Sequence, residues 1–125
     1  MITLQRINID DPNVDNDFGH RLLYQGRPFT GEVEEYQGDS LISRETYTDG
    51  IKDGLTCEWY RDGTLRAEGI IRKGLVAGEF RRWHPNGTLA KVQLNSDDGK
   101  RLLAEYEWDA EGHPIRSWQA NEDPD

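Results

Sequence analysis

A sequence unit of 24 residues recurs in the middle of this chain, and a fixed period of this length constrains the fold more than any local motif. Residues 47–65 and 71–89 match at five positions, each separated by 24 residues. An earlier copy begins at Tyr24, and a later, degenerate copy keeps Trp108 and Gly112 at a spacing of 25. We therefore expect about four stacked structural units. The matched pairs are Gly50/Gly74, Gly54/Gly78, Trp59/Trp83, Gly63/Gly87 and Leu65/Leu89.

Each unit has the pattern of two β-strands joined by a tight turn. Asp62-Gly63 and the equivalent Asn-Gly of the next unit favour hairpins, because such turns need a positive φ. Residues 55–59 alternate, which places Leu55, Cys57 and Trp59 on one face of a strand. We expect paired glycines such as Gly50 and Gly54 to reverse the chain between units. No segment of residues 20–118 has a helical pattern, so the predicted fold is all-β: an elongated single antiparallel β-meander of tandem hairpin repeats.

Aromatic residues occupy equivalent positions in the four units, at Tyr36, Trp59, Trp83 and Trp108. We interpret this row as a core ladder in which the rings stack from one unit to the next, because each repeat must bury apolar surface against its neighbours. A ligand-binding aromatic groove is the alternative.

Three segments divide the chain. Residues 1–22 include an acidic stretch, and we interpret them as an irregular cap over the first edge strand or as an exposed acidic arm. Residues 23–118 form the repeat domain, and residues 119–125 are expected to be a disordered acidic tail.

Charge and composition limit the partners. Fifteen basic and 24 acidic side chains give a net charge of −9, which opposes binding to nucleic acid or anionic lipid and suits a basic protein partner. Neither a secretory signal nor an apolar run long enough to span a bilayer is found in the sequence, so we expect a soluble, cytoplasmic protein. Cys57 is the only cysteine, which excludes an intramolecular disulfide and a cysteine-based zinc site.

The sequence lacks the motifs of common active sites. His20, His84 and His113 lie in unlike contexts, without the close spacing of paired metal ligands. The glycines recur at the hairpin period and do not form a phosphate-binding loop between a strand and a helix. We therefore expect no catalytic residues, no cofactor and no metal, and predict that the protein is not an enzyme. An enzyme with an unfamiliar site remains an alternative, which a deep pocket lined by perturbed carboxylates would support.

Residues 23–32, 47–54 and 58–69 carry a pattern of glycines, aromatics and leucines that resembles the MORN repeat. Specifically, it resembles the variant found in bacterial YwqK-like antitoxin and immunity proteins. The resemblance implies a non-catalytic protein of a toxin–antitoxin system that binds and neutralises a cognate toxin, and the acidic charge suits a basic toxin. The alternative is a MORN-type scaffold or membrane-associated interaction module, for which residues 66–101 carry a local charge of +4, with basic side chains at Arg72, Lys73, Arg81 and Arg82.

Two candidate surfaces could bind the toxin: the acidic N-terminal region or an exposed face of the sheet. The contact would form by charge-led docking or by strand addition at a sheet edge. We expect a monomer, with a dimer through an open edge as the alternative. The candidate partner-binding residues are Asp10, Asp11, Asp15, Asp17, Glu32, Glu34, Glu35, Trp59, Tyr60 and Trp83.

Overall fold

The computed structural model describes residues 5–120 and contains strands and turns without helices in that range. The start of the predicted cap and most of the predicted tail, residues 1–4 and 121–125, lie outside the described residues. No described segment forms a helix with the length and apolar character that a membrane crossing requires. The strands are β1 (Arg6–Asn8), β2 (Val14–Asn16), β3 (Leu22–Tyr24), β4 (Arg27–Pro28), β5 (Gly31–Gln37), β6 (Ser40–Thr48), β7 (Ile51–Trp59), β8 (Leu65–Arg72), β9 (Leu75–Trp83), β10 (Leu89–Asn95), β11 (Leu102–Trp108) and β12 (Pro114–Gln119).

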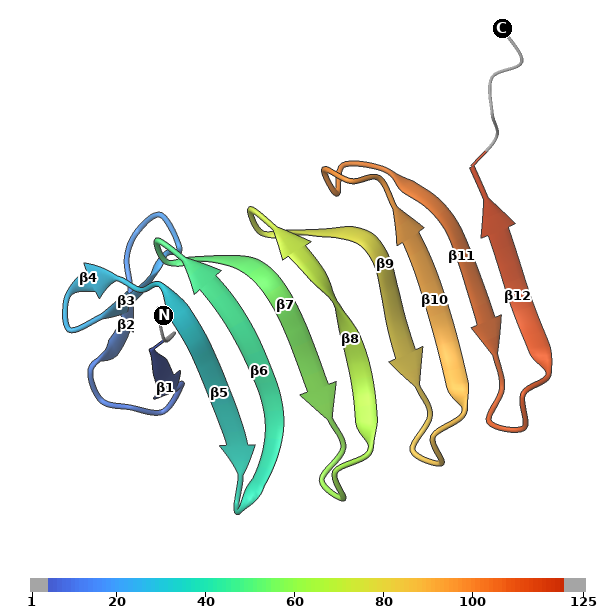
Figure 1. Cartoon of the computed structure of the whole chain (residues 1–125), viewed down its shortest axis with the longest axis horizontal. Helices are drawn as coiled ribbons and strands as arrows, with labels where there is room; N and C mark the ends of the chain where they lie inside the picture. The colour runs from blue at the N-terminus through green and yellow to red at the C-terminus, as the bar shows by residue number, and fades with distance from the viewer. Residues whose placement is uncertain (1–4, 121–125) are drawn as a thin grey trace, which may run out of the picture.

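Nine strands form one sheet in the order β1-β5-β6-β7-β8-β9-β10-β11-β12. From β5 to β12 each strand pairs antiparallel with the next one along the chain, which confirms the predicted meander of hairpins. Figure 1 shows these strands side by side in a single curved row along the long axis of the molecule. At the N-terminal end β1 pairs in parallel with β5, with Arg6 opposite Glu32. Strands β2, β3 and β4 form a separate small sheet beside this end.

The turns between units are two-residue turns centred on Asp49-Gly50 and Lys73-Gly74. All four residues have positive φ, at 49° and 83° in the first turn and 50° and 87° in the second, as type I′ hairpins require. The prediction that the second glycine of each pair also belongs to the reversal is wrong, because Gly54 lies inside β7. There the glycine permits a close approach, since a Cβ atom at this position would lie 3.0 Å from Cβ of Thr46.

The turns within units lie where the Asp-Gly and Asn-Gly pairs predicted them, but the loops are longer than two residues. The Tyr60 N–H donates to the Thr64 carbonyl at 2.9 Å, and the Gly63 N–H donates back to the Tyr60 carbonyl at 3.0 Å. The carboxylate of Asp62 accepts the N–H of Thr64 at 2.9 Å. The same loop recurs 24 residues later between His84 and Thr88.

A register shift recurs next to the aromatic residue of each hairpin. In the second unit Glu58 lies opposite Ala67 while Trp59 lies opposite Leu65, so Arg66 is the additional residue of a β-bulge. The bulge recurs at equivalent positions and gives the aromatic residues an apolar partner across the hairpin. These partners are Leu41 for Tyr36, Leu65 for Trp59, Leu89 for Trp83 and Pro114 for Trp108.

The aromatic row does not form the predicted stacked core ladder. Tyr36 is 40% exposed and the three tryptophans are only half-buried. Equivalent residues lie two strands apart, about 10 Å, whereas ring pairs interact at centroid distances of about 4.5–7 Å. Within residues 5–120 no ring pair joins two members of the row: the pairs are Tyr24 with Phe29 and Tyr106 with Trp108.

The core lies at the N-terminal end of the sheet. Ile7, Leu22, Phe29 and Val33 form its buried cluster, so β1 and the small sheet cover the first hairpin. Beyond this end of the sheet the buried apolar side chains are small, except for one large ring, that of Phe80. The small ones are Ala67, Ala77, Ala104 and Cys57. Both faces of the remaining sheet therefore carry largely accessible side chains.

Candidate partner-binding surfaces

The two faces of the sheet are defined by the register of its strands. Residues directly opposite one another in antiparallel strands project to the same face. Glu35 lies opposite Ser43, and Ser43 lies opposite Glu58, so these residues share what we call the Glu58 face. Arg44 lies opposite Cys57, on the other face with Trp59, which we call the Trp59 face.

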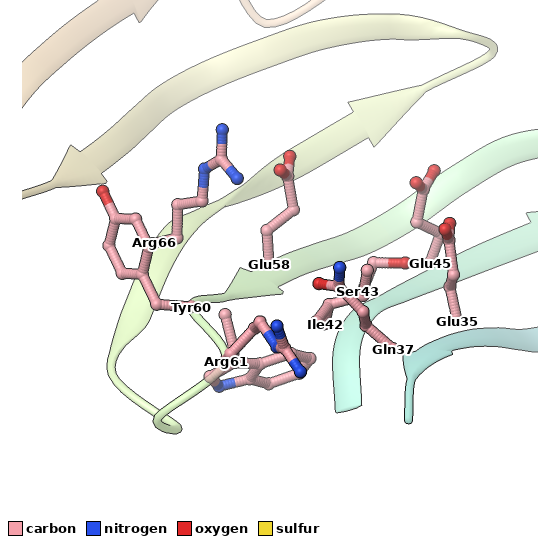
Figure 2. Close-up of a pocket in the computed structure, with 10 residues that line it drawn as sticks. Glu35, Gln37, Ile42, Ser43, Glu45, Glu58, Tyr60, Arg61 and Arg66 are labelled. Atoms are coloured by element: carbon pink, nitrogen blue, oxygen red, sulfur yellow. The ribbon is translucent and has the colours of Figure 1, made fainter. Parts of the chain in front are cut away.

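A shallow hollow of about 340 Å³ on the Glu58 face is lined by three carboxylates from three adjacent strands, Glu35 of β5, Glu45 of β6 and Glu58 of β7. Figure 2 shows these side chains extending to the same side of the sheet, with Tyr60 and Arg66 at one end of the hollow. Glu45 forms an ion pair with Lys52 at 2.7 Å. Within residues 5–120 Glu35 and Glu58 form no ion pair, so their charge is free to attract a cation.

The sequence predicted Glu35 as a partner-binding residue but missed Glu45 and Glu58. Glu35 and Glu58 immediately precede Tyr36 and Trp59, so they occupy equivalent repeat positions. That equivalence is a signal in the sequence that could have identified the pair. Glu45 has no such signal, because its place beside them depends on the pairing of β6 with both neighbours.

Glu32 and Glu34, both predicted as partner contacts, are engaged within the molecule. Glu34 is only 7% exposed, and its Oε2 accepts two hydrogen bonds from Arg44, at 2.7 and 2.9 Å. Arg6 binds Glu32 at 2.8 Å and approaches Glu34 at 3.7 Å. These ion pairs join β1, β5 and β6, so the two carboxylates stabilise the N-terminal end of the sheet, which we call the capped end because β1 and the small sheet cover it.

Of the four aspartates of the predicted acidic region, Asp15 lies in β2 and the other three lie in the loops on either side of that strand. Asp11 accepts the hydroxyl of Tyr24 at 3.1 Å, and the hydrogen bond raises the pKa of that tyrosine. Asp15 accepts the N–H of Asn16 within β2, and Asp17 accepts the N–H of Arg21 across the turn that follows, both at 2.8 Å. Asp10, Asp15 and Asp17 are exposed and remain available to a partner.

On the Trp59 face, a groove of about 430 Å³ runs beside the Trp59 ring and includes Leu41 and Arg44. The guanidinium of Arg44 lies 5.7 Å from the centre of the Trp59 ring, in the range of a cation–π contact. Trp83 is half-buried two strands further along. The predicted aromatic surface therefore exists as separate, partly accessible rings.

Tyr60 has a role in joining neighbouring units. Its hydroxyl donates to the carbonyl of Trp83 at 2.7 Å. His84, which occupies the equivalent position, places Nε2 2.8 Å from the carbonyl of Trp108. These bonds connect the second hairpin loop to the third unit and the third loop to the fourth, so His84 serves as an inter-unit contact.

The four basic residues singled out in the sequence do not form one surface. Arg81 belongs to the Trp59 face, where it binds Glu79 at 2.6 Å. Arg82 belongs to the Glu58 face, with its guanidinium 5.2 Å from the Phe80 ring centre. Arg72 lies at the end of β8 and Lys73 in the turn that follows.

One group of side chains has the donor atoms of a metal site. Ligand atoms of Asp109, Glu111 and His113 lie within 4.8 Å of one another in the last hairpin loop. The spacing of the three histidines did not reveal this group, which the alternation of donors at Asp109, Glu111 and His113 could have indicated. Asp109 already accepts the N–H groups of His113 and Glu111, and these bonds lower its pKa. His113 and Glu111 are exposed, so the group is an open surface arrangement.

Comparisons with protein-family models, with curated proteins and with solved structures find no match to this chain. The likeness to MORN repeats therefore stays a resemblance of motifs, and the fold is described by its own geometry as a single-layer meander of hairpins.

Proposed function

We propose that this protein is an antitoxin or immunity protein that binds a basic toxin and neutralises it by protein–protein contact. The observation that carries the proposal is the hollow on the Glu58 face, where three carboxylates from adjacent strands meet and two of them have no cation partner among residues 5–120. The net charge of −9 and the motif resemblance to bacterial immunity proteins support the same function.

A basic side chain of the toxin fits the chemistry of the hollow. Glu35 and Glu58 offer carboxylates to a lysine or arginine, while the ring of Tyr60 provides an apolar wall at one end. Arg61 and Arg66 also line the hollow and would repel a cation from that end, which favours entry beside Glu35. Acidic charge around the site would speed association with a basic partner and make it sensitive to salt.

Neutralisation in this proposal needs no catalysis. A single-layer sheet presents a wide face, and a partner docked on the Glu58 face would have its own basic surface covered. Toxins that act on nucleic acid use basic surfaces to hold the phosphate backbone, so such a cover would block the substrate. The exposed Asp10, Asp15 and Asp17 would extend the acidic surface if the partner reaches the small sheet.

The test is a titration against the protein encoded in the adjacent reading frame, combined with rescue of cells that express that protein. We expect tight binding, rescue, and an affinity that falls as salt is raised. The double substitution Glu35→Gln with Glu58→Gln should weaken binding at least about tenfold, since a hydrogen bond to a charged group contributes about 1.5–3 kcal/mol.

The matched control is Asp97→Asn with Glu111→Gln, which removes the same charge from exposed positions outside the hollow. Equal weakening by both pairs would show that only net charge matters and would refute the assignment to the hollow. Absence of both binding and rescue would favour the scaffold alternative, for which salt-sensitive binding to anionic liposomes is the corresponding measurement.

A further inference from the structure

The C-terminal end of the sheet presents an open strand edge. β12 is the last strand in the sheet order, and all six of its residues are exposed. Ile115 is 61% exposed and Trp118 is 46% exposed. Its one pairing partner among the described strands is β11, so one side of its backbone faces solvent.

The register identifies which backbone groups point outward. The Ala120 N–H donates to the Leu103 carbonyl at 2.8 Å, and Ala104 lies opposite Gln119. Residues of an antiparallel pair alternate between those that bond to the neighbour and those that do not. Trp118 therefore bonds toward β11, whereas the N–H and C=O groups of Ser117 and Gln119 point away from the sheet.

The two ends of the sheet differ. At the N-terminal end β1 is only three residues long, and short edge strands hinder further pairing. A chain with one open edge forms a closed pair by an antiparallel, two-fold contact, in which both copies use the same surface. The three-residue edge at β1 disfavours the second contact that growth into a fibre requires.

We propose that β12 pairs antiparallel with β12 of a second copy of this chain, centred on Ser117. In this register the Ser117 N–H of each copy donates to the Ser117 carbonyl of the other copy. Arg116 of one copy lies opposite Trp118 of the other, where a guanidinium can stack on an indole ring. Arg116 is the only charged residue of β12, so no like charges of the paired strands face each other.

The dependence on salt concentration distinguishes dimerisation through β12 from binding of the toxin. Each copy carries a net charge of −9, so screening weakens their repulsion and dimerisation strengthens as salt is raised. Binding of a basic toxin has the opposite dependence. The inference is thus independent of the proposed function, and either can fail alone.

The experiment is sedimentation or light scattering of the full chain across micromolar concentrations at low and high salt, with two variants. Ser117→Pro removes the outward N–H without removing a bond to β11, and proline is tolerated in an edge strand where the N–H faces solvent. Ser117→Ala keeps that N–H and is the control. We expect a wild-type dimer, an unchanged control, and a dissociation constant at least about tenfold higher for Ser117→Pro, because two symmetry-related hydrogen bonds are lost.

Amide hydrogen exchange of the wild type gives a second readout that does not depend on the folding of a variant. The Ser117 and Gln119 amides should become protected as concentration rises, while neighbouring loop amides should not. A monomer under every condition, an assembly larger than two, or a dimer with unprotected Ser117 and Gln119 amides would each overturn the proposal.

Discussion

The contact between Gly69 and Phe80 offers a sharp test of how this single-layer sheet is stabilised. Gly69 lies in β8 on the Glu58 face, and the Phe80 ring from β9 lies directly over it. A Cβ atom at position 69 would meet Cδ2 of Phe80 at 2.3 Å. Ordinary carbon contacts are about 3.5–4.0 Å, so Gly69→Ala must displace the ring by more than about 1 Å.

The magnitude follows from the burial of Phe80, which is 6% exposed and one of the few large buried side chains beyond the capped end. Full exposure of such a side chain costs about 1.5–3 kcal/mol. Gly69 does not have a positive φ, so alanine itself should gain about 0.5–1 kcal/mol over glycine in a strand. We therefore expect Gly69→Ala to lower the free energy of unfolding by about 1–2 kcal/mol.

A double-mutant cycle isolates this contact. In the Phe80→Ala background the ring is gone, so Gly69→Ala should become neutral or stabilising by about 0.5–1 kcal/mol. Urea unfolding followed by tryptophan fluorescence and by circular dichroism measures all four proteins and tests whether the repeats unfold together. An equal loss of stability from Gly69→Ala in both backgrounds would refute the argument that Phe80 covers the glycine.

Three further predictions concern individual side chains. Tyr60→Phe removes the hydroxyl that binds the Trp83 carbonyl and should lower the free energy of unfolding by about 0.5–1.5 kcal/mol. Urea titration measures this loss, and an unchanged unfolding midpoint would contradict the role of Tyr60 in joining units. The hydrogen bond from Lys91 lowers the pKa of Glu105 in the folded protein. The stabilisation by this bond is therefore present above the pKa of Glu105 in the unfolded chain and is lost as pH falls through its pKa in the folded protein. Lys91→Met should make the free energy of unfolding depend less steeply on pH in the acid range. Burial raises the pKa of the Cys57 thiol, so iodoacetamide should modify it slowly at mildly alkaline pH until urea unfolds the chain, and rapid modification of the folded protein would contradict the buried position.

The sequence was sufficient to predict the meander, because its turn residues and aromatic residues recur with one period. Gly50 and Gly63 occupy positive-φ positions in two different turns, and both recur 24 residues later. The boundaries of the turns were harder to predict. Asp49 and Lys73 adopt a positive φ without being glycine, and Gly54, which resembles a turn residue, lies within a strand. Local preference alone does not distinguish these cases, because strand pairing decides them.

The candidate site was only partly predictable for a related reason. Glu35 and Glu45 are ten residues apart in the sequence, and they reach one hollow only because β6 pairs with β5 in a particular register. A shift of one residue would move Glu45 to the opposite face. The same dependence applies to Glu34, which the sequence presents as one more acidic residue and the fold buries against Arg44.

The recurring β-bulge links stability to the surface that we propose for binding. Across β7 and β8 the bulge at Arg66 lets Trp59 face Leu65 while Glu58 faces Ala67. Each hairpin end thus keeps a large apolar pair on the Trp59 face, and the residue before the aromatic projects from the Glu58 face. Its partner across the hairpin is small in the first two units, Ser43 and Ala67, and basic in the last two, Lys91 and Arg116. Because no second layer among the described residues covers that face at the ends of the hairpins, side chains at this position are free to vary with little loss of packing. The repeat accordingly carries Glu35 and Glu58 at one end of the sheet and Arg82 at the equivalent position further along, which gives a single face different charges along its length.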